Sequence, residues 1–346
     1  MVSTDVTAAV PADAAKAVST RVTAAPRKGR RRRRYSQLSR RDKITLAIFV
    51  GVPTTVHIMF VWVPAISTVL LSFTKWDGLR LGTWKLLGFR NYWSVFTVFD
   101  GKFFPAFFNN VVLLVFLAMC SVVGVLFAYL LDKNIRASAI YQSIFYMPVV
   151  LSLAVVGFIW KGVMYSPSQG MFNVILGRTA QGDQIDWVGN AQKIFTIHIP
   201  GLDTPLGLSK NFAALLIAMA WRHIGYVMVL YLAGLKSVDP SLREAAAIDG
   251  CNEWQSFRRV IFPVMKPINV VVFVITVIEA LRAFDIIVAL QKPPGMQVLG
   301  VLVRDNLVGE GGGQVGLGST YGVVLLLLCL VFIIWYLVNS YREDRV

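Results

Sequence analysis

The sequence is short of charge and of cysteine, and each shortage excludes a class of protein. Asp, Glu, Lys and Arg make up only 15% of the residues, whereas about a quarter is usual in soluble domains. The three cysteines, Cys120, Cys251 and Cys329, lie far apart and lack the spacing of metal ligands. We therefore expect neither a disulfide framework nor a metal site.

Motifs of catalysis and nucleotide binding are also missing. The sequence contains no H-E-x-x-H, C-x-x-C or G-x-S-x-G pattern, and it has only three histidines. It has no G-x-x-x-x-G-K-[ST] loop with which to hold the phosphates of a nucleotide. We expect a chain that is not an enzyme and carries no cofactor.

Apolar residues are abundant instead, at 56% of the chain, and they gather in long segments that are almost free of charge. A segment of about 20 apolar residues is long enough to cross a bilayer as a helix. The pattern predicts an all-α, polytopic membrane protein with six transmembrane helices in a domain of residues 44–341. The expected helices cover residues 44–74, 105–131, 137–160, 211–235, 267–290 and 321–341.

The N-terminus differs from the rest of the chain. Residues 1–43 have no apolar period and end in a cluster of Lys and Arg, which predicts a disordered basic arm. Nucleic-acid binding is one interpretation of this cluster. Its position directly before an apolar segment favours attraction to anionic lipid and a cytoplasmic location. Residues 342–346 form a short charged tail.

Two of the apolar segments contain charged or titratable residues. Arg222 and His223 lie in the fourth, and Glu279, Arg282 and Asp285 lie in the fifth at spacings of three, which predicts one helix face on which Arg282 pairs with a carboxylate. Such charges must face protein or water. A structural ion-pair cluster, contact with a hydroxylated substrate and a proton relay in an ion-coupled secondary transporter are the alternatives.

Residues 235–267 form a long polar interruption between the fourth and fifth apolar segments. Asp239 is placed to cap a first short helix and Gly250 to end it. Asn252 is placed to cap a second helix, which Pro263 should stop. The sequence therefore predicts a helical elbow with two short helices that meet at a glycine.

The elbow also carries a resemblance to a known family. The order Glu244, Ala245, Ala246, then Asp249, Gly250, then Ile261, Phe262, Pro263 resembles the EAA loop of the permease subunits of bacterial binding-protein-dependent ABC importers. In that family the loop is a cytoplasmic coupling helix that docks on a separate ATPase subunit, where ATP is hydrolysed. The resemblance implies that the ATPase-coupling residues are Leu242, Glu244, Ala245, Ala246, Asp249 and Gly250.

Other segments are similar to the carbohydrate permeases of the same family. The matches include Trp76, Asp77 and Gly78, the segment 144–148 and the segment 316–319, whereas residues 291–295 depart from the family's Gly-Gly-Pro pattern. The resemblance implies that a sugar or oligosaccharide is the substrate, with a phosphorylated polyol as the alternative. It implies three kinds of partner: a second permease subunit, cytoplasmic ATPase subunits and an extracytoplasmic substrate-binding protein.

A path for sugars needs aromatic faces and polar groups. Trp221, Tyr226, Glu279 and Asp285 supply both, and they are the candidate path residues. A phosphate-bearing substrate would instead need arginines that no carboxylate already pairs. Residues 191–210 lengthen the preceding loop, and both a small β-hairpin and an added contact with the binding protein are open.

The distribution of Lys and Arg predicts the orientation. The side that holds both termini and residues 235–267 carries 21 of them, and the other side carries 11. The richer side is cytoplasmic by the positive-inside rule. We expect a multi-pass protein of the bacterial plasma membrane with both termini in the cytoplasm and little reason to bind nucleic acid.

Overall fold

The computed structural model describes residues 39–343 except 80–81, 99, 134–135 and 310–312. The chain forms two compact units, Met1–Val61 and Trp62–Val346. Most of the predicted basic arm, residues 1–38, lies outside the described residues, as do residues 344–346 of the tail. The end of the arm is helical, because α1 begins at Arg40.

In the first unit the described helix is α1 (Arg40–His57). The Ser39 hydroxyl accepts the backbone N–H of Asp42, and the Asp42 carboxylate accepts the backbone N–H of Ser39, at 3.2 and 3.1 Å. This reciprocal pair satisfies two N–H groups that the first helical turn leaves without partners. A π-helical turn, η1 (Ile58–Trp62), continues the chain toward the second unit.

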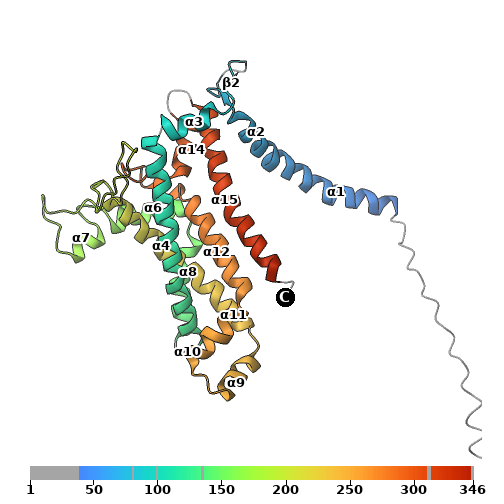
Figure 1. Ribbon diagram of the computed structural model, residues 1–346. Coiled ribbons are helices and arrows are strands. Elements are labelled where there is room, and N and C mark those ends of the chain that lie inside the picture. The colour runs from blue at the N-terminus through green and yellow to red at the C-terminus, as the bar shows by residue number, and fades with distance from the viewer. Residues whose placement is uncertain (1–38, 80–81, 99, 134–135, 310–312, 344–346) are drawn as a thin grey trace, which may run out of the picture. The chain divides into compact units, whose positions relative to one another are not determined.

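The second unit is predominantly helical, which confirms the predicted all-α class in outline (Figure 1). Two short strands, β1 (Thr74–Lys75) and β2 (Lys85–Leu86), pair antiparallel. The helical segments are α2 (Val63–Leu71), α3 (Arg90–Thr97), α4 (Asp100–Asp132), α5 (Ser138–Val150), α6 (Leu153–Ile159), η2 (Trp160–Met164), α7 (Met171–Ile175), α8 (Lys210–Ser237), α9 (Pro240–Ile248), α10 (Glu253–Ser256), η3 (Phe257–Ile261), α11 (Phe262–Val264), α12 (Lys266–Leu281), α13 (Asp285–Ala289), α14 (Leu299–Val308) and α15 (Val315–Glu343).

Four helices of the described residues are long and apolar enough to cross a membrane. They correspond to the first, second, fourth and sixth predicted segments. Their bounds are Arg40–Leu71, Gly101–Asp132, Lys210–Ser237 and Val315–Tyr336.

The third predicted helix is wrong as a straight helix, because α5 and the α6–η2 pair meet at an angle of 103°. Pro148 near the end of α5 has no N–H to donate, and the Ser152 hydroxyl accepts the N–H of Val155 to start α6 anew. The fifth predicted helix is also wrong in length. α12 ends at Leu281, and α13 is a separate short helix.

The core of the second unit lies where α4 packs along α8, and α5 packs against the other side of α8. Small residues allow the close approach. A Cβ at Gly124 of α4 would lie 2.8 Å from Cβ of Val227, and one at Gly225 of α8 would lie 2.0 Å from the backbone oxygen of Phe145 in α5. Helices in membranes often pack through such residues, because backbone contact replaces the hydrophobic driving force.

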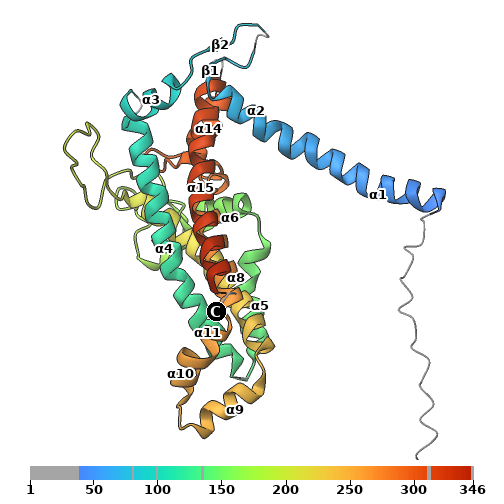
Figure 2. The same ribbon diagram turned by 45° about the vertical axis from the view of Figure 1, so that its right-hand side comes forward.

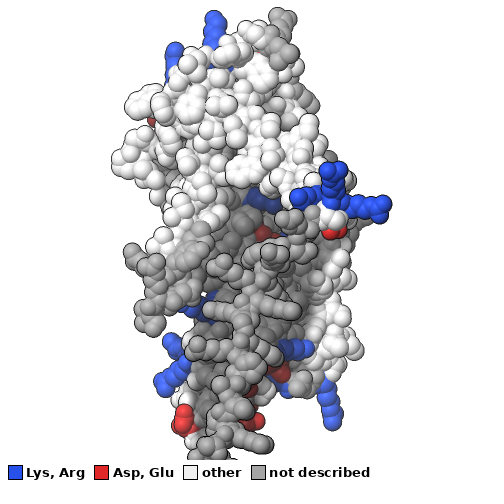
Figure 3. Space-filling view, turned by 90° about the vertical axis from the view of Figure 1, so that its right-hand side faces the viewer, with Lys and Arg blue, Asp and Glu red and all other residues white. Residues whose placement is uncertain are grey.

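Uncharged side chains cover most of the described surface on the face drawn in Figure 3. On α4, Val115, Met119 and Val122 form an exposed apolar stripe at spacings of three and four. A stripe of this kind fits contact with lipid or with another membrane helix. Residues 191–210 contain antiparallel bridges between Lys193 and Ser209 and between Ile197 and Leu206, which favours the β-hairpin of the two alternatives.

The second unit has two distinct ends. Figures 1 and 2 both show α9 and α10 at one end, and the β1–β2 hairpin with α3 at the opposite end. The polar interruption between α8 and α12 therefore lies apart from the loops that join α2 to α4.

Candidate substrate path and coupling segment

A buried cluster of charged and polar side chains joins α4, α8 and α12. Glu279 of α12 forms an ion pair with Arg222 of α8, and Nδ1 of His223 donates to the second carboxylate oxygen at 2.6 Å. The other ring nitrogen of His223 lies 3.0 Å from Oγ of Ser121 on α4. His223 is 1% exposed, so its ring is packed in the bundle as well as hydrogen-bonded.

The predicted face that joins Glu279, Arg282 and Asp285 is wrong. The partners of Glu279 come from α8, and among the described residues neither Arg282 nor Asp285 forms an ion pair. The physical reason is the end of α12: the side chain of Asn110 donates to the carbonyl of Ala280 at 2.7 Å. That bond replaces the one that a further helical turn would provide, so the spacing of three no longer defines a face.

Aromatic side chains from several segments pack beside this cluster. The ring centroid of Trp221 lies 5.8 Å from that of Trp160 in an edge-to-face arrangement, and Trp160 lies 5.1 Å from Tyr165. Nε1 of Trp160 and Nε of Arg222 are buried without a partner among the described residues. Tyr226, the other predicted aromatic path residue, is half-buried four positions after Arg222.

Asparagines hold the segment between α12 and α14, and the sequence analysis missed them. Asn109 donates to the carbonyls of Gly295 and Gln297, and Asn110 accepts the N–H of Leu299 at 2.9 Å in addition to donating to Ala280. On α8, Asn211 donates to the carbonyl of Pro294 at 2.6 Å. The available signal was the presence of amide side chains inside apolar segments, where a buried polar group needs a partner.

A cavity of about 590 Å³ lies beside this segment, between Tyr165, Lys161, Asp186 and Gln291. Gln291 and Lys292 both adopt left-handed backbone conformations, with φ of 67° and 49°. Non-glycine residues pay for such conformations with about 1–2 kcal/mol each. Strained residues of this kind cluster at functional sites, so the cavity beside Gln291 is a candidate for a functional role.

Loss of the Asn110 side chain should destabilise the protein. Asn110→Ala leaves the carbonyl of Ala280 and the N–H of Leu299 without partners, so we expect the free energy of unfolding to fall by about 1–3 kcal/mol for each group. Thermal unfolding in a fixed detergent measures the change. Asn306→Ala is the matched control, because Asn306 donates only within its own helix, to the carbonyl of Leu302. Equal melting temperatures for the two variants would contradict the assignment.

The segment between α8 and α12 has the predicted caps. The carboxylate of Asp239 accepts the N–H of Ser241, which holds the pKa of Asp239 below its usual range. Its stabilising effect is therefore present above about pH 4 and is lost as the pH falls through the lowered pKa. Asn252 and Gln255 form a reciprocal capping box at the start of α10, and Gly250 between the helices has φ of 82°.

The expected stop at Pro263 is wrong. Residues 257–261 form the π-helical turn η3, and Pro263 lies in the first turn of α11, where its missing N–H is not needed. The helical path turns at Met265 instead.

The residues predicted to couple to an ATPase divide into two groups. Leu242 packs against the buried cluster around α8 and η3, and Ala246 is 4% exposed, so both face the bundle. Ile248 is 86% exposed and is the apolar residue at the open surface of α9. The exposed members of the predicted set are Glu244, Ala245, Asp249 and Gly250.

An ion pair ties α9 to the end of α4. Nη1 of Arg243 lies 2.7 Å from the carboxylate of Asp132, whose side chain is 10% exposed. Lys133 and Glu253 form a second pair beside it at the surface, and the hydrogen bond that Lys133 donates to the Glu253 carboxylate raises the pKa of Lys133. The first pair is the stronger link, because solvent screens the second.

One protein family matches nearly the whole length of the chain. Residues 32–342 match the family described as "Binding-protein-dependent transport system inner membrane component". The chain belongs to this family.

Individual members of the family show the same coverage. The chain is 29% identical to the xylose/arabinose import permease protein XacH of Haloferax volcanii, over 87% of this chain and 90% of the relative. It is 28% identical to the trehalose/maltose transport system permease protein MalF of Thermococcus litoralis, over 84% and 92%. Its fold resembles a chain of a bacterial alginate ABC transporter in complex with an alginate pentasaccharide-bound periplasmic protein, with a TM-score of 0.65 at 21% identity over 88% and 96%.

Proposed function

We propose that this family member is the permease subunit of an ATP-driven importer, with six spans and both termini in the cytoplasm. The spans are α1–α2, α4, α5–α6, α8, α12–α13 and α15. The observation that carries the proposal is the exposed surface of α9 around Glu244, Ala245 and Ile248, in a segment between the two helices that share the Arg222–Glu279 pair. A separate ATPase that moves α9 can thereby move α8 and α12.

The proposed importer contains a second permease subunit, two copies of the ATPase and an extracytoplasmic binding protein. One six-helix unit offers few polar walls, whereas an interface between two permeases is lined from both sides. The exposed apolar stripe on α4 supports such an interface. Transport by this chain purified alone as a monomer would contradict the proposal.

The proposed cargo is a sugar or an oligosaccharide. Sugars offer C–H faces for aromatic rings and oxygen atoms for buried N–H donors, and the region around Trp221, Trp160 and Arg222 supplies both. Arg222 already pairs with Glu279, which speaks against its use on the phosphate of a phosphorylated polyol. Arg282 forms no ion pair among the described residues, so it is the arginine that such a cargo would need. We propose that Trp221, Tyr226, Glu279 and Asp285 line the path.

Ligand retention by the cognate binding protein tests the cargo. The binding protein is exposed to a mixture of sugars, sugar phosphates, amino acids and peptides, and the retained compound is identified by mass spectrometry. We expect a neutral sugar, and we expect its uptake to be lost in a strain that lacks this chain. Retention and chain-dependent uptake of an amino acid would overturn the carbohydrate proposal and leave the importer proposal standing.

The energy source separates an importer from an ion-coupled transporter. In vesicles that hold the complete assembly, we expect uptake to require ATP and to persist when an ionophore removes ion gradients. The reason is that Glu279, the acidic residue of the buried cluster, is the partner of Arg222, and its protonation would leave that guanidinium without a counter-charge. Uptake that follows the ion gradient without ATP would reverse this conclusion.

A further inference from the structure

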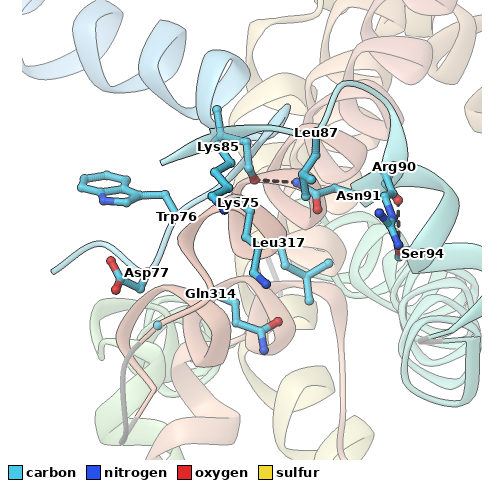
Figure 4. A pocket seen from close by; sticks show the side chains of 13 residues that line it. Lys75, Trp76, Asp77, Lys85, Leu87, Arg90, Asn91, Ser94, Gln314 and Leu317 are labelled. Atoms are coloured by element: carbon cyan, nitrogen blue, oxygen red, sulfur yellow. Dashed lines mark hydrogen bonds between the residues drawn. The ribbon is translucent and has the colours of Figure 1, made fainter. Parts of the chain in front are cut away.

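A second cavity lies at the end of the bundle opposite α9, and the proposed transport function does not use it. Its volume is about 570 Å³. Three segments line it: the β1–β2 hairpin, one face of α3 and the start of α15 (Figure 4). All three segments belong to the second unit.

Three cationic side chains line this cavity. Lys75 and Lys85 occupy directly opposite positions in the two-strand ribbon, and Arg90 of α3 lines the same cavity. Like charges directly opposite each other destabilise a β-ladder. Among the residues that the structure describes, none of the three cations forms an ion pair. An anion that contacts all three side chains would reduce the repulsion between their charges.

The backbone that carries these cations is fixed by buried polar contacts. The side chain of Asn91 donates to the carbonyls of Ser72 and Thr74, both at 2.8 Å, and the hydroxyl of Thr320 donates to the carbonyl of Ser72 at 3.1 Å. A Cβ at Gly316 would lie 1.9 Å from the backbone oxygen of Thr74, so only glycine lets α15 start this close to β1. The backbone positions of the three cations are therefore fixed before any ligand arrives, which lowers the cost of binding.

Exposed apolar side chains surround the cationic cavity. On the hairpin, Trp84 and Leu86 flank Lys85 in sequence and are 58% and 74% exposed. Phe89, the N-cap of α3, and Trp93 of α3 are 75% and 72% exposed, whereas Arg90 and Ser94 line the cavity. Tryptophan and basic residues in this combination are typical of the interface between a bilayer and water.

The depth of the cavity agrees with such an interface. β1 follows directly after α2 and contacts the start of α15, and α3 contacts the start of α4. The cavity therefore lies where apolar spans end, at the level of lipid headgroups. An acidic protein would satisfy the three cations, but it would leave Trp84 and Trp93 without an apolar environment.

We propose that this cavity binds the phosphate headgroup of an anionic phospholipid, with Lys75, Lys85 and Arg90 around the phosphate and Trp84 and Trp93 in the surrounding interface. Asp77, the carboxylate among the described lining residues, accepts the N–H of Leu79 at 3.0 Å. The proposal rests on residence in a membrane and is independent of the cargo.

Native mass spectrometry of the full chain in detergent tests the proposal. The probes are phosphatidylglycerol, phosphatidylcholine with the same acyl chains, and inorganic phosphate. We expect wild-type protein to retain phosphatidylglycerol in preference to phosphatidylcholine. Each basic residue near an anionic lipid surface contributes about a fivefold change in affinity, so Lys85→Gln should weaken binding about fivefold and the triple variant Lys75→Gln/Lys85→Gln/Arg90→Gln about a hundredfold.

The matched control is Lys102→Gln, which removes an exposed cation from the first turn of α4, outside the cavity lining. It should bind phosphatidylglycerol as the wild type does. If the triple variant does not fold, the wild type decides the question by itself: phosphatidylglycerol should raise its melting temperature more than phosphatidylcholine does.

Three results would overturn the proposal. The first is equal retention of phosphatidylglycerol by the triple variant and the wild type. The second is inorganic phosphate that binds as tightly as the lipid, which would indicate a site for free anions. The third is a triple variant that keeps the lipid but no longer associates with the binding protein, which would indicate an acidic protein surface as the occupant.

Discussion

Replacement of Glu279 by leucine should lower the free energy of unfolding by about 3–5 kcal/mol. The substitution leaves the guanidinium of Arg222 buried at membrane depth, with its side chain 20% exposed and its carboxylate partner gone. Denaturation followed by tryptophan fluorescence in a fixed detergent measures the loss. Unchanged stability would show that the ion pair is not formed in the protein.

The double variant Arg222→Leu/Glu279→Leu separates structure from transport. Removing both partners avoids an uncompensated charge, so we expect stability to return to within about 1–2 kcal/mol of the wild type. The ring of His223 then keeps Ser121 as a hydrogen-bond partner. Normal uptake by the double variant would mean that the ion pair stabilises the fold and is not needed for transport. Loss of uptake at restored stability would show that the Arg222–Glu279 pair is needed for transport.

Gly250→Val should reduce uptake about tenfold while the assembly still hydrolyses ATP. Gly250 has φ of 82°, a conformation that costs a residue with a side chain about 1–2 kcal/mol and a β-branched residue more. The chain between α9 and α10 must then rearrange, which moves the exposed face of α9 relative to α8. Uptake and ATP hydrolysis measured in the same vesicles, with and without loaded binding protein, give the degree of uncoupling.

Gly250→Asn is the matched control for this prediction. A Cβ at position 250 meets no atom within 4 Å, so steric overlap is the same small factor in both variants. Asparagine tolerates the left-handed conformation far better than valine does. We expect Gly250→Asn to transport near the normal rate. Equal loss of transport in both variants would point to a role for the exposed surface at Gly250 itself. Normal transport by Gly250→Val would show that the turn at Gly250 is not needed to transmit movement of α9 to α8 and α12.

Local signals in the sequence predicted the segment between α8 and α12 well. Asp239 and Asn252 cap helices and Gly250 adopts a left-handed conformation, as predicted, because caps and left-handed turns depend on one or two neighbouring residues. The prediction that Pro263 ends the second helix was wrong. The effect of a proline depends on whether the preceding turn needs its N–H, and the π-helical turn η3 does not.

The buried cluster shows where such reasoning ends. The spacing of Glu279, Arg282 and Asp285 assumed a continuous helix, but Asn110, 170 residues away in sequence, takes the hydrogen bond that would continue α12. The partner of Glu279 is likewise a residue of another helix, Arg222. Tertiary contacts of this kind leave no periodic pattern in the sequence. The sequence therefore could not show which of the predicted path residues lie together, and their role on the path stays a proposal.

Asn109, Asn110 and Asn211 bind backbone groups from the end of α12 to the start of α14. These hydrogen bonds make no demand on the side chains of residues 291–295, whereas the left-handed backbone at Gly295, with φ of 87°, favours glycine. We therefore expect that residues 291–295, where this chain departs from the carbohydrate permease pattern, can be exchanged for those of another permease if a glycine is kept at position 295. Exchange of residues 291–295 between permeases is therefore a route to altering which substrates they transport.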